Sequence, residues 1–285
     1  MSSLEAANLF SVKGMVAVIT GGGTGIGLMM TKALAINGAS KVYIIGRRMD
    51  KLEAAAKEHP SIVPIQGDVL SKDSLTAIEQ RITSEVGYVN VVIANSGVTG
   101  PEPPESLKKD ASMQQVRDYW FSQPPEKFTD TFAVNTTGVF YTALAFLPLL
   151  DAGNKKGNVQ QKSQIIATSS IGGFSRIAPV GPAYGPSKAA VTHLMKQLAT
   201  SYVDYDIRCN ILAPGPYPSD LAGSLFANHS EPGTLPRSFV PAGRAGTDED
   251  MAGAILYLTS RAGGFCNGSV IVTDGGRLGI LPSSY

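Results

Sequence analysis

The sequence predicts an α/β fold: a doubly wound, seven-stranded parallel sheet flanked by helices, in a single domain over residues 1–285. Apolar runs of strand length recur along the chain, helical patterns separate them, and the balance of 43% hydrophobic to 16% charged residues suits one buried core. The expected strands are residues 15–20, 41–46, 62–67, 89–95, 164–169, 206–212 and 269–273. The expected helices are residues 25–37, 50–58, 73–86, 126–150, 183–203 and 248–261.

Three irregular stretches interrupt this alternation. Residues 100–125 carry five prolines and predict a partly helical excursion. Residues 152–162 are polar and contain glycine, which indicates a surface loop. Residues 214–241 are rich in Pro, Gly and Ser and follow the carboxyl end of a strand, where open α/β sheets bind ligands. We therefore interpret residues 214–241 as a substrate lid.

The charge balance favours a small molecule as the partner. With 24 basic and 23 acidic side chains, the net charge of +1 provides no global field for nucleic acid or an anionic membrane. Cys209, Cys266 and the scattered histidines lack metal-binding spacing, so we expect no metal. The N-terminus lacks a signal-peptide pattern, and no apolar run reaches the roughly 18 residues of a membrane span, so we expect a cytoplasmic location.

A glycine-rich turn, TGGGTGIG, joins the first expected strand to the first helix. Glycine lets the backbone turn tightly and approach a pyrophosphate, and the amides at the helix start then attract its negative charge. The alternative is a glycine-rich turn that binds nothing. The residues expected to bind a dinucleotide here are Gly21, Thr24, Gly25, Ile26 and Gly27.

The residues after the second expected strand indicate which dinucleotide binds. An acidic side chain at this point accepts hydrogen bonds from a ribose 2′-hydroxyl and repels a 2′-phosphate. This chain instead has Arg47 and Arg48 there, and guanidinium groups pair with phosphate through directed donors. The prediction is NADP(H), with Arg47 as the first candidate. The alternative is that both arginines are simply solvated at a helix start.

The pattern YxxxK begins the helix expected at residues 183–203. Tyr184 and Lys188 are four residues apart and so share one helical face, and Pro186 fits if it lies in the first turn. Reducing a ketone requires a proton donor beside the carbonyl oxygen, and a nearby positive charge lowers the pKa of a phenol toward a useful range. The spacing alone is weak evidence, because YxxxK occurs by chance in many helices.

Together these motifs resemble the classical short-chain dehydrogenase/reductase family, whose sheet is Rossmann-like. TGxxxGIG after the first strand is that family's cofactor motif, and the resemblance spans about residues 12–276, with P-x-x-R at 241–244 and D-G-G at 274–276. The chain departs from the family's N-A-G element, because Ser96 replaces the alanine. The further cofactor contacts that the resemblance implies are Asp68, Val69, Asn95, Ser96, Gly97, Tyr184, Lys188, Pro214, Gly215 and Pro216.

The same resemblance implies a catalytic set. The segment after the fifth strand is similar to S-S-x-x-G, in which the second serine orients the substrate carbonyl, so we assign Ser170 and keep Ser169 as the backup. Tyr184 would deliver the proton, while Lys188 would bind ribose hydroxyls and lower the tyrosine pKa. Asn135, from an N-x-x-G element, would hold a water that links the lysine to solvent. Each residue alone has a common structural role, but their order behind the nucleotide motif favours catalysis.

The implied reaction is NADPH-dependent reduction of a ketone to a secondary alcohol by hydride transfer. The sequences at residues 183–190 and 213–219 are most similar to the rhamnolipid-biosynthesis type of β-ketoacyl reductase, which indicates a β-ketoacyl substrate. The apolar character of the expected pocket residues indicates a hydrophobic or polycyclic ketone. No arginine or lysine can be assigned to a substrate carboxylate or carrier phosphate. The expected pocket residues are Ile171, Phe174, Pro216, Tyr217, Leu221, Leu225 and Phe226. Several of them could instead only pack the lid onto the domain.

Two other classes of function stay open. One is an NADPH-binding regulatory or scaffold protein of the same fold, because fold does not fix function. The other is a tailoring enzyme that works as an alcohol dehydrogenase, or as a non-redox cyclase or isomerase. The sequence sets neither the substrate, the stereochemistry nor the reaction direction.

The helices expected at residues 126–150 and 183–203 carry apolar residues on more than one face. Such a helix needs a second surface to cover it, and the family pairs these helices between subunits, which implies a homodimer or homotetramer. Examples of these apolar residues are Phe140, Leu144, Leu147, Val191, Leu194 and Leu198.

Overall fold

The computed structural model describes residues 4–104, 107, 111–222 and 233–285. At its centre is one seven-stranded parallel sheet with the strand order β3-β2-β1-β4-β5-β6-β7. This order confirms the predicted doubly wound, Rossmann-like fold. The strands are β1 Val16–Thr20, β2 Lys41–Gly46, β3 Ile62–Gln66, β4 Val91–Ala94, β5 Gln164–Thr168, β6 Arg208–Pro214 and β7 Val270–Thr273.

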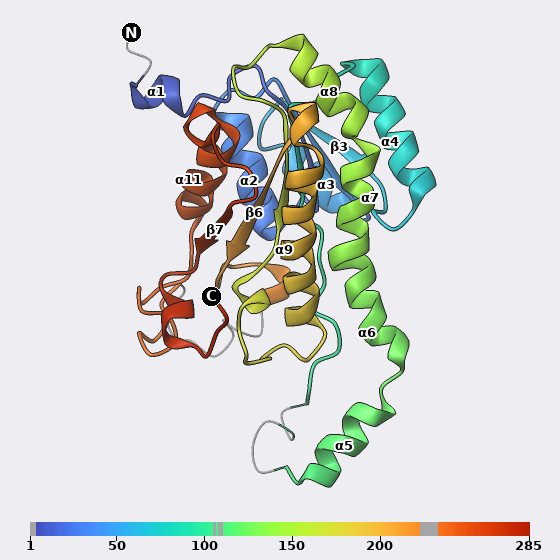
Figure 1. Cartoon of the computed structure of the whole chain (residues 1–285), viewed down its shortest axis with the longest axis vertical. Helices are drawn as coiled ribbons and strands as arrows, with labels where there is room; N and C mark the ends of the chain where they lie inside the picture. Colours follow the sequence, from blue (N-terminus) through green and yellow to red (C-terminus); the bar gives the residue numbers. More distant parts are fainter. Residues whose placement is uncertain (1–3, 105–106, 108–110, 223–232) are drawn as a thin grey trace.

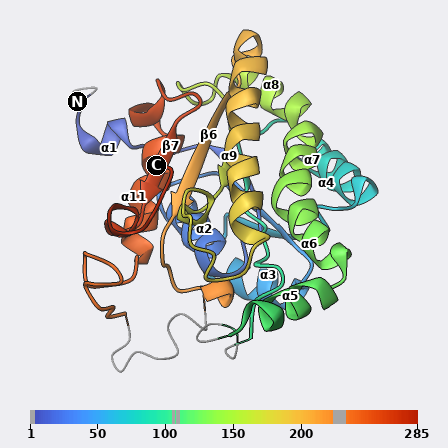
Figure 2. The ribbon, with the colours of Figure 1, turned by 60° about the horizontal axis from the view of Figure 1, so that its bottom comes forward.

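Helices cover both faces of the sheet (Figures 1 and 2). They are α2 Gly25–Ile36, α3 Met49–Ala56, α4 Lys72–Glu85, α7 Gly138–Ala145, α9 Tyr184–Ser201 and α11 Asp248–Thr259. One face packs on α4, α7 and α9, through side chains such as Ile82 and Met195. The other packs on α2, α3 and α11, through side chains such as Met30 and Ile255.

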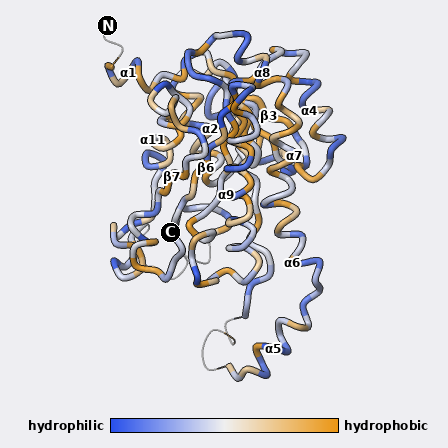
Figure 3. Tube along the Cα trace, in the orientation of Figure 1, coloured by the Kyte–Doolittle hydropathy of each residue, from blue (hydrophilic) through white to orange (hydrophobic). Residues whose placement is uncertain are grey.

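The central strands are buried on both faces, and Figure 3 shows hydrophobic residues gathered around them. Double burial explains why these strands are continuous apolar runs rather than alternating ones. The chain runs outward from β1 to β3 and then crosses to β4, so the strand order reverses between β1 and β4. In open α/β sheets, ligands bind at the carboxyl ends of the strands beside this reversal.

The helix expected over residues 126–150 is broken into α6 Pro125–Phe132, a π-helical turn Ala133–Thr137, α7, and α8 Leu147–Lys156. The chain leaves the helical conformation at Phe146, and Pro148 then lies in the first turn of α8. A proline there has no amide to donate and suits a helix start. The loop expected at residues 152–162 is therefore helical up to Lys156, where Gly157 ends α8 at φ +61°.

The excursion at residues 100–125 is partly helical, as predicted. It contains α5 Met113–Ser122, which begins with a capping box between Ser112 and Gln115. Figure 1 shows α5 extending beyond the body of the molecule. The hydroxyl of Tyr119 on α5 donates to the carbonyl of Glu102 at 2.7 Å and connects the two sides of the excursion.

Shorter elements complete the described chain: helix α1 Ala6–Leu9 and the 3₁₀ turns Ile171–Gly173, Val203–Tyr205, Asp220–Ala222, Arg261–Gly263 and Arg277–Ile280. Within the described residues, no single helix is long and apolar enough to cross a membrane. The bent pair Pro125–Ala145 and Leu147–Lys156 meets the length and composition criteria only when its two parts are counted together.

Candidate active site

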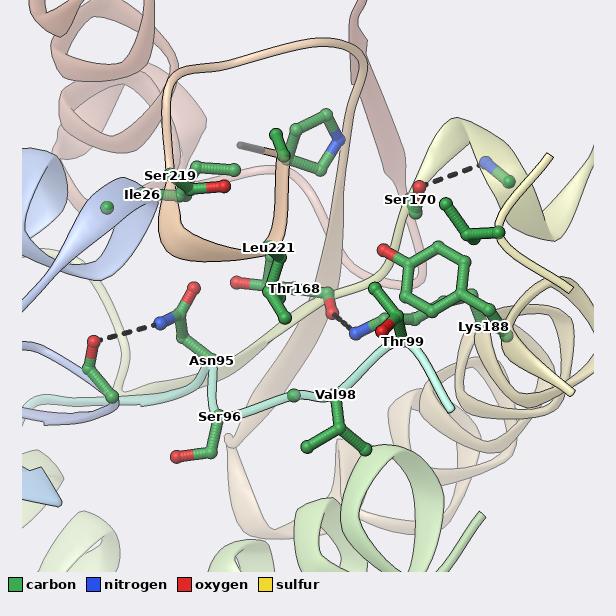
Figure 4. Close-up of a pocket in the computed structure, with 18 of the residues that line it drawn as sticks. Ile26, Asn95, Ser96, Val98, Thr99, Thr168, Ser170, Lys188, Ser219 and Leu221 are labelled. Atoms are coloured by element: carbon green, nitrogen blue, oxygen red, sulfur yellow. Dashed lines mark hydrogen bonds between the residues drawn. The ribbon is translucent and has the colours of Figure 1, made fainter. Parts of the chain in front are cut away.

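A cavity of about 740 Å³ lies along the carboxyl ends of the strands, within the range typical of ligand pockets. It runs from the glycine-rich turn to the start of α9 and the C-terminal segment. Figure 4 shows Ile26 and Asn95 on one side of it, with Ser170 and Lys188 on the other. Every residue expected to contact the cofactor lines this cavity.

The glycine-rich turn needs its glycines for geometric reasons. Gly21 and Gly25 have φ of +66° and +51°, in the left-handed region that side chains disfavour. A Cβ on Gly27 would lie 2.1 Å from the carbonyl oxygen of Gly21, so α2 can approach the turn this closely only with glycine. Because α2 begins at Gly25, its unpaired amides face the cavity end, as a pyrophosphate site requires.

Asn95 fastens the end of β4 to this turn. Its Nδ2 donates to the carbonyls of Thr20 and Gly21 at 3.1 and 3.3 Å, and Thr20 Oγ1 accepts from the amides of Asn95 and Ser96. These bonds hold the crevice between β1 and β4 in shape. Nearby, the buried Thr168 Oγ1 has no hydrogen-bond partner among the described residues and lines the cavity, which suits a polar ligand.

Arg47 and Arg48 are exposed beside the cavity but differ in their contacts. Arg48 Nη2 donates to Asp220 Oδ2 at 2.9 Å and to Thr24 Oγ1 at 3.3 Å. The Arg47 guanidinium makes no hydrogen bond or ion pair with any other residue that the structure describes. Of the two, Arg47 is the group available to a phosphate. The cradle of glycines and this arginine together fit a phosphorylated dinucleotide.

Tyr184, Lys188 and Ser170 converge at the other end of the cavity. Tyr184 is the first residue of α9 and Pro186 lies in the first turn, as expected. Lys188 is 4% exposed, and its Nζ donates to the carbonyl of Thr168 at 2.8 Å, 5.8 Å from the centroid of the Tyr184 ring (Figure 4). The phenol and the ammonium therefore share one buried site.

The structure separates the two candidate serines. Both serines line the cavity, and Ser170 Oγ accepts from the amide of Gly172 at 3.0 Å, next to the ring of Tyr184. Ser169 is buried, and its Oγ donates to the carbonyl of Lys188 at 2.9 Å and pairs with Thr192 at 2.7 Å. Ser169 thus fastens β5 to α9, which leaves Ser170 as the candidate for contact with a substrate.

Burial has the largest effect on the pKa values of Tyr184 and Lys188. It raises the pKa of the Tyr184 phenol above its ordinary value, against the opposing effect of the neighbouring Ser170 hydroxyl. It also lowers the pKa of Lys188 from 10.5 to about 8. The expected lowering of the tyrosine pKa by Lys188 is not among the causes of the shift at Tyr184.

Asn135 lies behind the cavity wall, fully buried in the π-helical turn. Its Oδ1 accepts from the amide of Val98 at 2.9 Å, and its Nδ2 donates to the carbonyl of Val98 at 2.9 Å and to Ser187 Oγ at 3.0 Å. A Cβ on Gly97 would lie 3.2 Å from Asn135 Oδ1 and 3.3 Å from Lys188 Nζ. Glycine therefore leaves a space between the amide and the ammonium.

The structure agrees with part of the predicted substrate pocket and corrects another part. Ile171, Pro216, Tyr217 and Leu221 line the cavity. Tyr217 is mostly core, being 3% exposed. Phe174 does not line the cavity, because its ring packs edge-on against Tyr285 at 5.1 Å. The expected contacts Leu225 and Phe226 lie outside the described residues.

Sequence reasoning missed much of the wall that the structure shows. These lining residues are Val98, Thr99, Ser175 to Pro182, Ser219, Phe239, Arg277 and Leu281. Most come from irregular segments that carry no periodic signal. The C-terminal residues reach the cavity through contacts with residues 174–176, which nothing in the local sequence predicts.

A doubly wound sheet with a glycine-rich turn at its point of reversal defines a dinucleotide-binding protein. The family model described as "short chain dehydrogenase" matches residues 15–230. The chain therefore belongs to the short-chain dehydrogenase/reductase family, in its classical form, and is an NAD(P)-dependent oxidoreductase.

Individual relatives agree with this placement. The chain is 51% identical to the short-chain dehydrogenase/reductase PhomF of Diaporthe leptostromiformis, over 99% of this chain and 98% of that protein. It is 28% identical to RhlG of Pseudomonas aeruginosa, solved in an NADP active-site complex, with a TM-score of 0.77 over 94% and 98% of the two chains. A gluconate 5-dehydrogenase of Burkholderia cenocepacia, solved with NADP and tartrate, is 26% identical, with a TM-score of 0.78 over 96% and 99%.

Proposed function

We propose that this protein is an NADPH-dependent reductase that converts a hydrophobic, polycyclic or β-ketoacyl ketone to a secondary alcohol. The observation that carries the proposal is the meeting of Tyr184, Ser170 and Lys188 at one end of the cofactor cavity, with Ser170 Oγ beside the Tyr184 ring. The family supplies the oxidoreductase class. The named similarity to a 3-oxoacyl-[acyl-carrier-protein] reductase, at 28% identity, supports a ketone substrate.

When bound, the nicotinamide cofactor supplies the hydride. Ser170 donates a hydrogen bond to the substrate carbonyl oxygen and orients it toward Tyr184. Tyr184 gives its proton to that oxygen, and the raised pKa of the phenol keeps the proton in place until the oxygen gains charge. Both residues act in a water-poor site, where directed donors are most effective.

Lys188 and Asn135 act behind Tyr184. The Lys188 ammonium binds ribose hydroxyls and offsets charge that develops on the phenol oxygen. The space that Gly97 leaves between Asn135 Oδ1 and Lys188 Nζ suits a water that returns protons from solvent. Asn135 also holds Val98 against α9 through Ser187, which makes it a positioning residue as well.

The decisive experiment compares paired variants in an NADPH-oxidation assay with a panel of ketones. Tyr184→Phe and Ser170→Ala should each lose nearly all turnover, and NADPH fluorescence titration should show that Tyr184→Phe still binds cofactor. Ser169→Ala is the matched control and should keep the chemical step. Substantial turnover in Tyr184→Phe contradicts the mechanism, and an absence of NADPH consumption by the wild type with every ketone favours a binding role.

The preference for NADP(H) rests on Arg47. Its guanidinium is exposed at the cavity without a protein partner in the described part of the chain, where a ribose 2′-phosphate would meet it. We expect Arg47→Ala to lower kcat/KM for NADPH about tenfold or more, with little change for NADH. A wild type that uses NADH equally well overturns this assignment.

We further propose a homodimer or homotetramer formed through α7 and α9. Of the apolar residues on these helices, Val191 and Leu198 are buried in the core, whereas Phe140 and Leu194 are half-buried and can meet a second copy. Light scattering on the purified protein tests this, and a monomer contradicts it.

Residues 214–241 remain our candidate substrate lid, and residues 223–232 of this segment lie outside the described part.

A further inference from the structure

The C-terminal segment forms part of the cavity wall beside Ser170. Ser283 forms an antiparallel bridge with Ser175, the amide of Arg176 donates to the carbonyl of Pro282 at 2.8 Å, and the amide of Ser284 donates to the carbonyl of Phe174 at 2.8 Å. These contacts fasten the chain end to the segment that follows the catalytic serine. Arg176 on one side of this junction, and Arg277 and Leu281 on the other, line the cavity.

Arg277 is a half-buried cation without an acidic partner. Its guanidinium stacks on the Phe239 ring, 3.6 Å from the ring centroid, and Nη1 donates to the Phe239 carbonyl. Within the described residues it forms no ion pair. Asp274 acts on it only at longer range, because the two carboxylate oxygens of Asp274 accept from the amides of Gly276 and Leu278 at 2.9 and 2.7 Å.

An arginine has five N–H donors, and the Phe239 carbonyl accepts from one nitrogen. The remaining donors belong to a guanidinium that lines a ligand cavity. A partly desolvated cation without a counter-charge is unfavourable unless something supplies that charge. Burial also lowers the pKa of Arg277, because it removes water from around the charged guanidinium.

The distribution of charge around the cavity is uneven. Arg176 is exposed at the same end, and its side chain has no hydrogen-bond partner in the part of the chain that the structure describes. The acidic residues among the described lining are Asp68 and Asp220, both at the cofactor end, and Asp220 is paired with Arg48. The end beside Ser170 is therefore positive, with apolar side chains such as Ile177 around it.

We propose that this end of the cavity binds an anionic group of the substrate, with Arg277 as the main donor and Arg176 as the second. The inference rests on the proposed ketone reduction and narrows its substrate class: an apolar ketone that carries a carboxylate or a phosphate. A guanidinium binds either anion through directed, charge-assisted hydrogen bonds. The stacking on Phe239 holds the Arg277 side chain in place before the anion arrives.

The test uses ketones that differ in charge at one position: 4-acetylbenzoate, its methyl ester, and 4-acetylphenyl phosphate. With NADPH saturating, kcat/KM is measured for the wild type, Arg277→Met, Arg277→Lys and Arg176→Gln. Arg237→Met is the control, because Arg237 also donates to a loop carbonyl, that of Pro241, but does not line the cavity. The readout is the ratio of anion to ester, which a merely structural role of Arg277 would leave unchanged.

We expect the wild type and Arg237→Met to prefer an anion over the ester by about ten- to a hundredfold, and Arg277→Met to bring this ratio near one. Arg277→Lys should keep part of the preference, and Arg176→Gln should lower it less. A preference for the carboxylate or for the phosphate identifies which anion the site takes. An equal ratio in the wild type and Arg277→Met overturns the proposal.

A failure of ketone reduction is distinguishable from a failure of this site. If the wild type reduces none of the three ketones, 4-acetylbenzoate and 4-acetylphenyl phosphate are titrated calorimetrically into the NADP⁺-loaded wild type and Arg277→Met. Binding of either anion by the wild type that Arg277→Met loses supports the anion site and counts against the reductase proposal alone. Absent or equal binding of both anions overturns the anion site itself.

Discussion

Burial of the Lys188 ammonium destabilises the fold at neutral pH, and the structure sets the size of the effect. The side chain is 4% exposed, and burial lowers its pKa from 10.5 to about 8. This interval corresponds to about 3.4 kcal/mol, at about 1.36 kcal/mol for each pH unit. Because the folded-state pKa lies below the unfolded one, the penalty is complete below about pH 8 and disappears as the pH rises toward 10.5.

The perturbation is Lys188→Met, which keeps an unbranched side chain but cannot titrate. Relative to this variant, the free energy of unfolding of the wild type should rise by about 2 kcal/mol between pH 7 and pH 9.5. Comparing pH values cancels the pH-independent loss of the hydrogen bond to Thr168. The assay is urea unfolding followed by circular dichroism, with equal m-values for both proteins.

Lys196→Met provides the control, because Lys196 is exposed on the same helix. It should show no pH-dependent difference from the wild type. If the free energy of unfolding depends on pH in the same way for the wild type and Lys188→Met, the reasoning is refuted. That result would mean that folding does not desolvate the charged Lys188 Nζ. Lys188 is also a residue of the proposed catalytic set, so the proposal implies that stability and activity are opposed at this position.

Two further predictions concern the glycines and Ser187. Gly27→Ala should abolish cofactor binding, measured by fluorescence titration, because the new Cβ would clash with the Gly21 carbonyl. Gly253 lies in the middle of α11, and nothing is within 4 Å of a Cβ placed there. Gly253→Ala should therefore stabilise the fold by about 0.5–1 kcal/mol, measured by thermal unfolding. Ser187→Ala should cost about 1–3 kcal/mol and lower kcat, because Ser187 Oγ donates to the Tyr184 carbonyl and accepts from Asn135; an unchanged kcat would mean that this network does not position the phenol.

The sequence predicted the sheet well, because parallel strands buried on both faces appear as uninterrupted apolar runs. The same holds for local motifs: the glycine-rich turn, the YxxxK helix start and the paired serines each fix geometry within a few residues. The choice of Ser170 over Ser169 rests on the family resemblance, and the hydrogen bonds that Ser169 makes to Lys188 and Thr192 agree with it.

Other parts of the site depend on contacts between distant segments. The C-terminal segment lies against the cavity wall where Ser283 pairs with Ser175, more than a hundred residues earlier, and no local pattern encodes that pairing. Phe174 was expected in the pocket from its type and place, but Tyr285 draws its ring to the C-terminal segment. The break at Phe146 was missed because the apolar pattern continues through it, although Pro148 marks the new helix start.

The ion pair between Arg48 and Asp220 raises a last question about cofactor choice. It joins the end of β2 to the segment after β6 across the cofactor end of the cavity, and both side chains are more than half exposed, at 57% and 63%. Exposed pairs contribute little to stability. Their effect here is instead on charge: Asp220 partly neutralises Arg48, and under the proposed preference for NADP(H) it would place a carboxylate near the ribose 2′-phosphate.

Asp220→Asn should therefore strengthen NADPH binding by up to about fivefold and leave NADH binding nearly unchanged, since removing the carboxylate frees Arg48 for the phosphate. The ratio of the two dissociation constants is measured by fluorescence titration at low and at high salt, and the gain should shrink as salt screens the charges. Arg47 would still carry most of the preference, so Arg47→Ala should weaken NADPH binding in both backgrounds. If Asp220→Asn changes NADPH and NADH affinity equally, the carboxylate does not act on the 2′-phosphate, and the pair only fastens the two segments together.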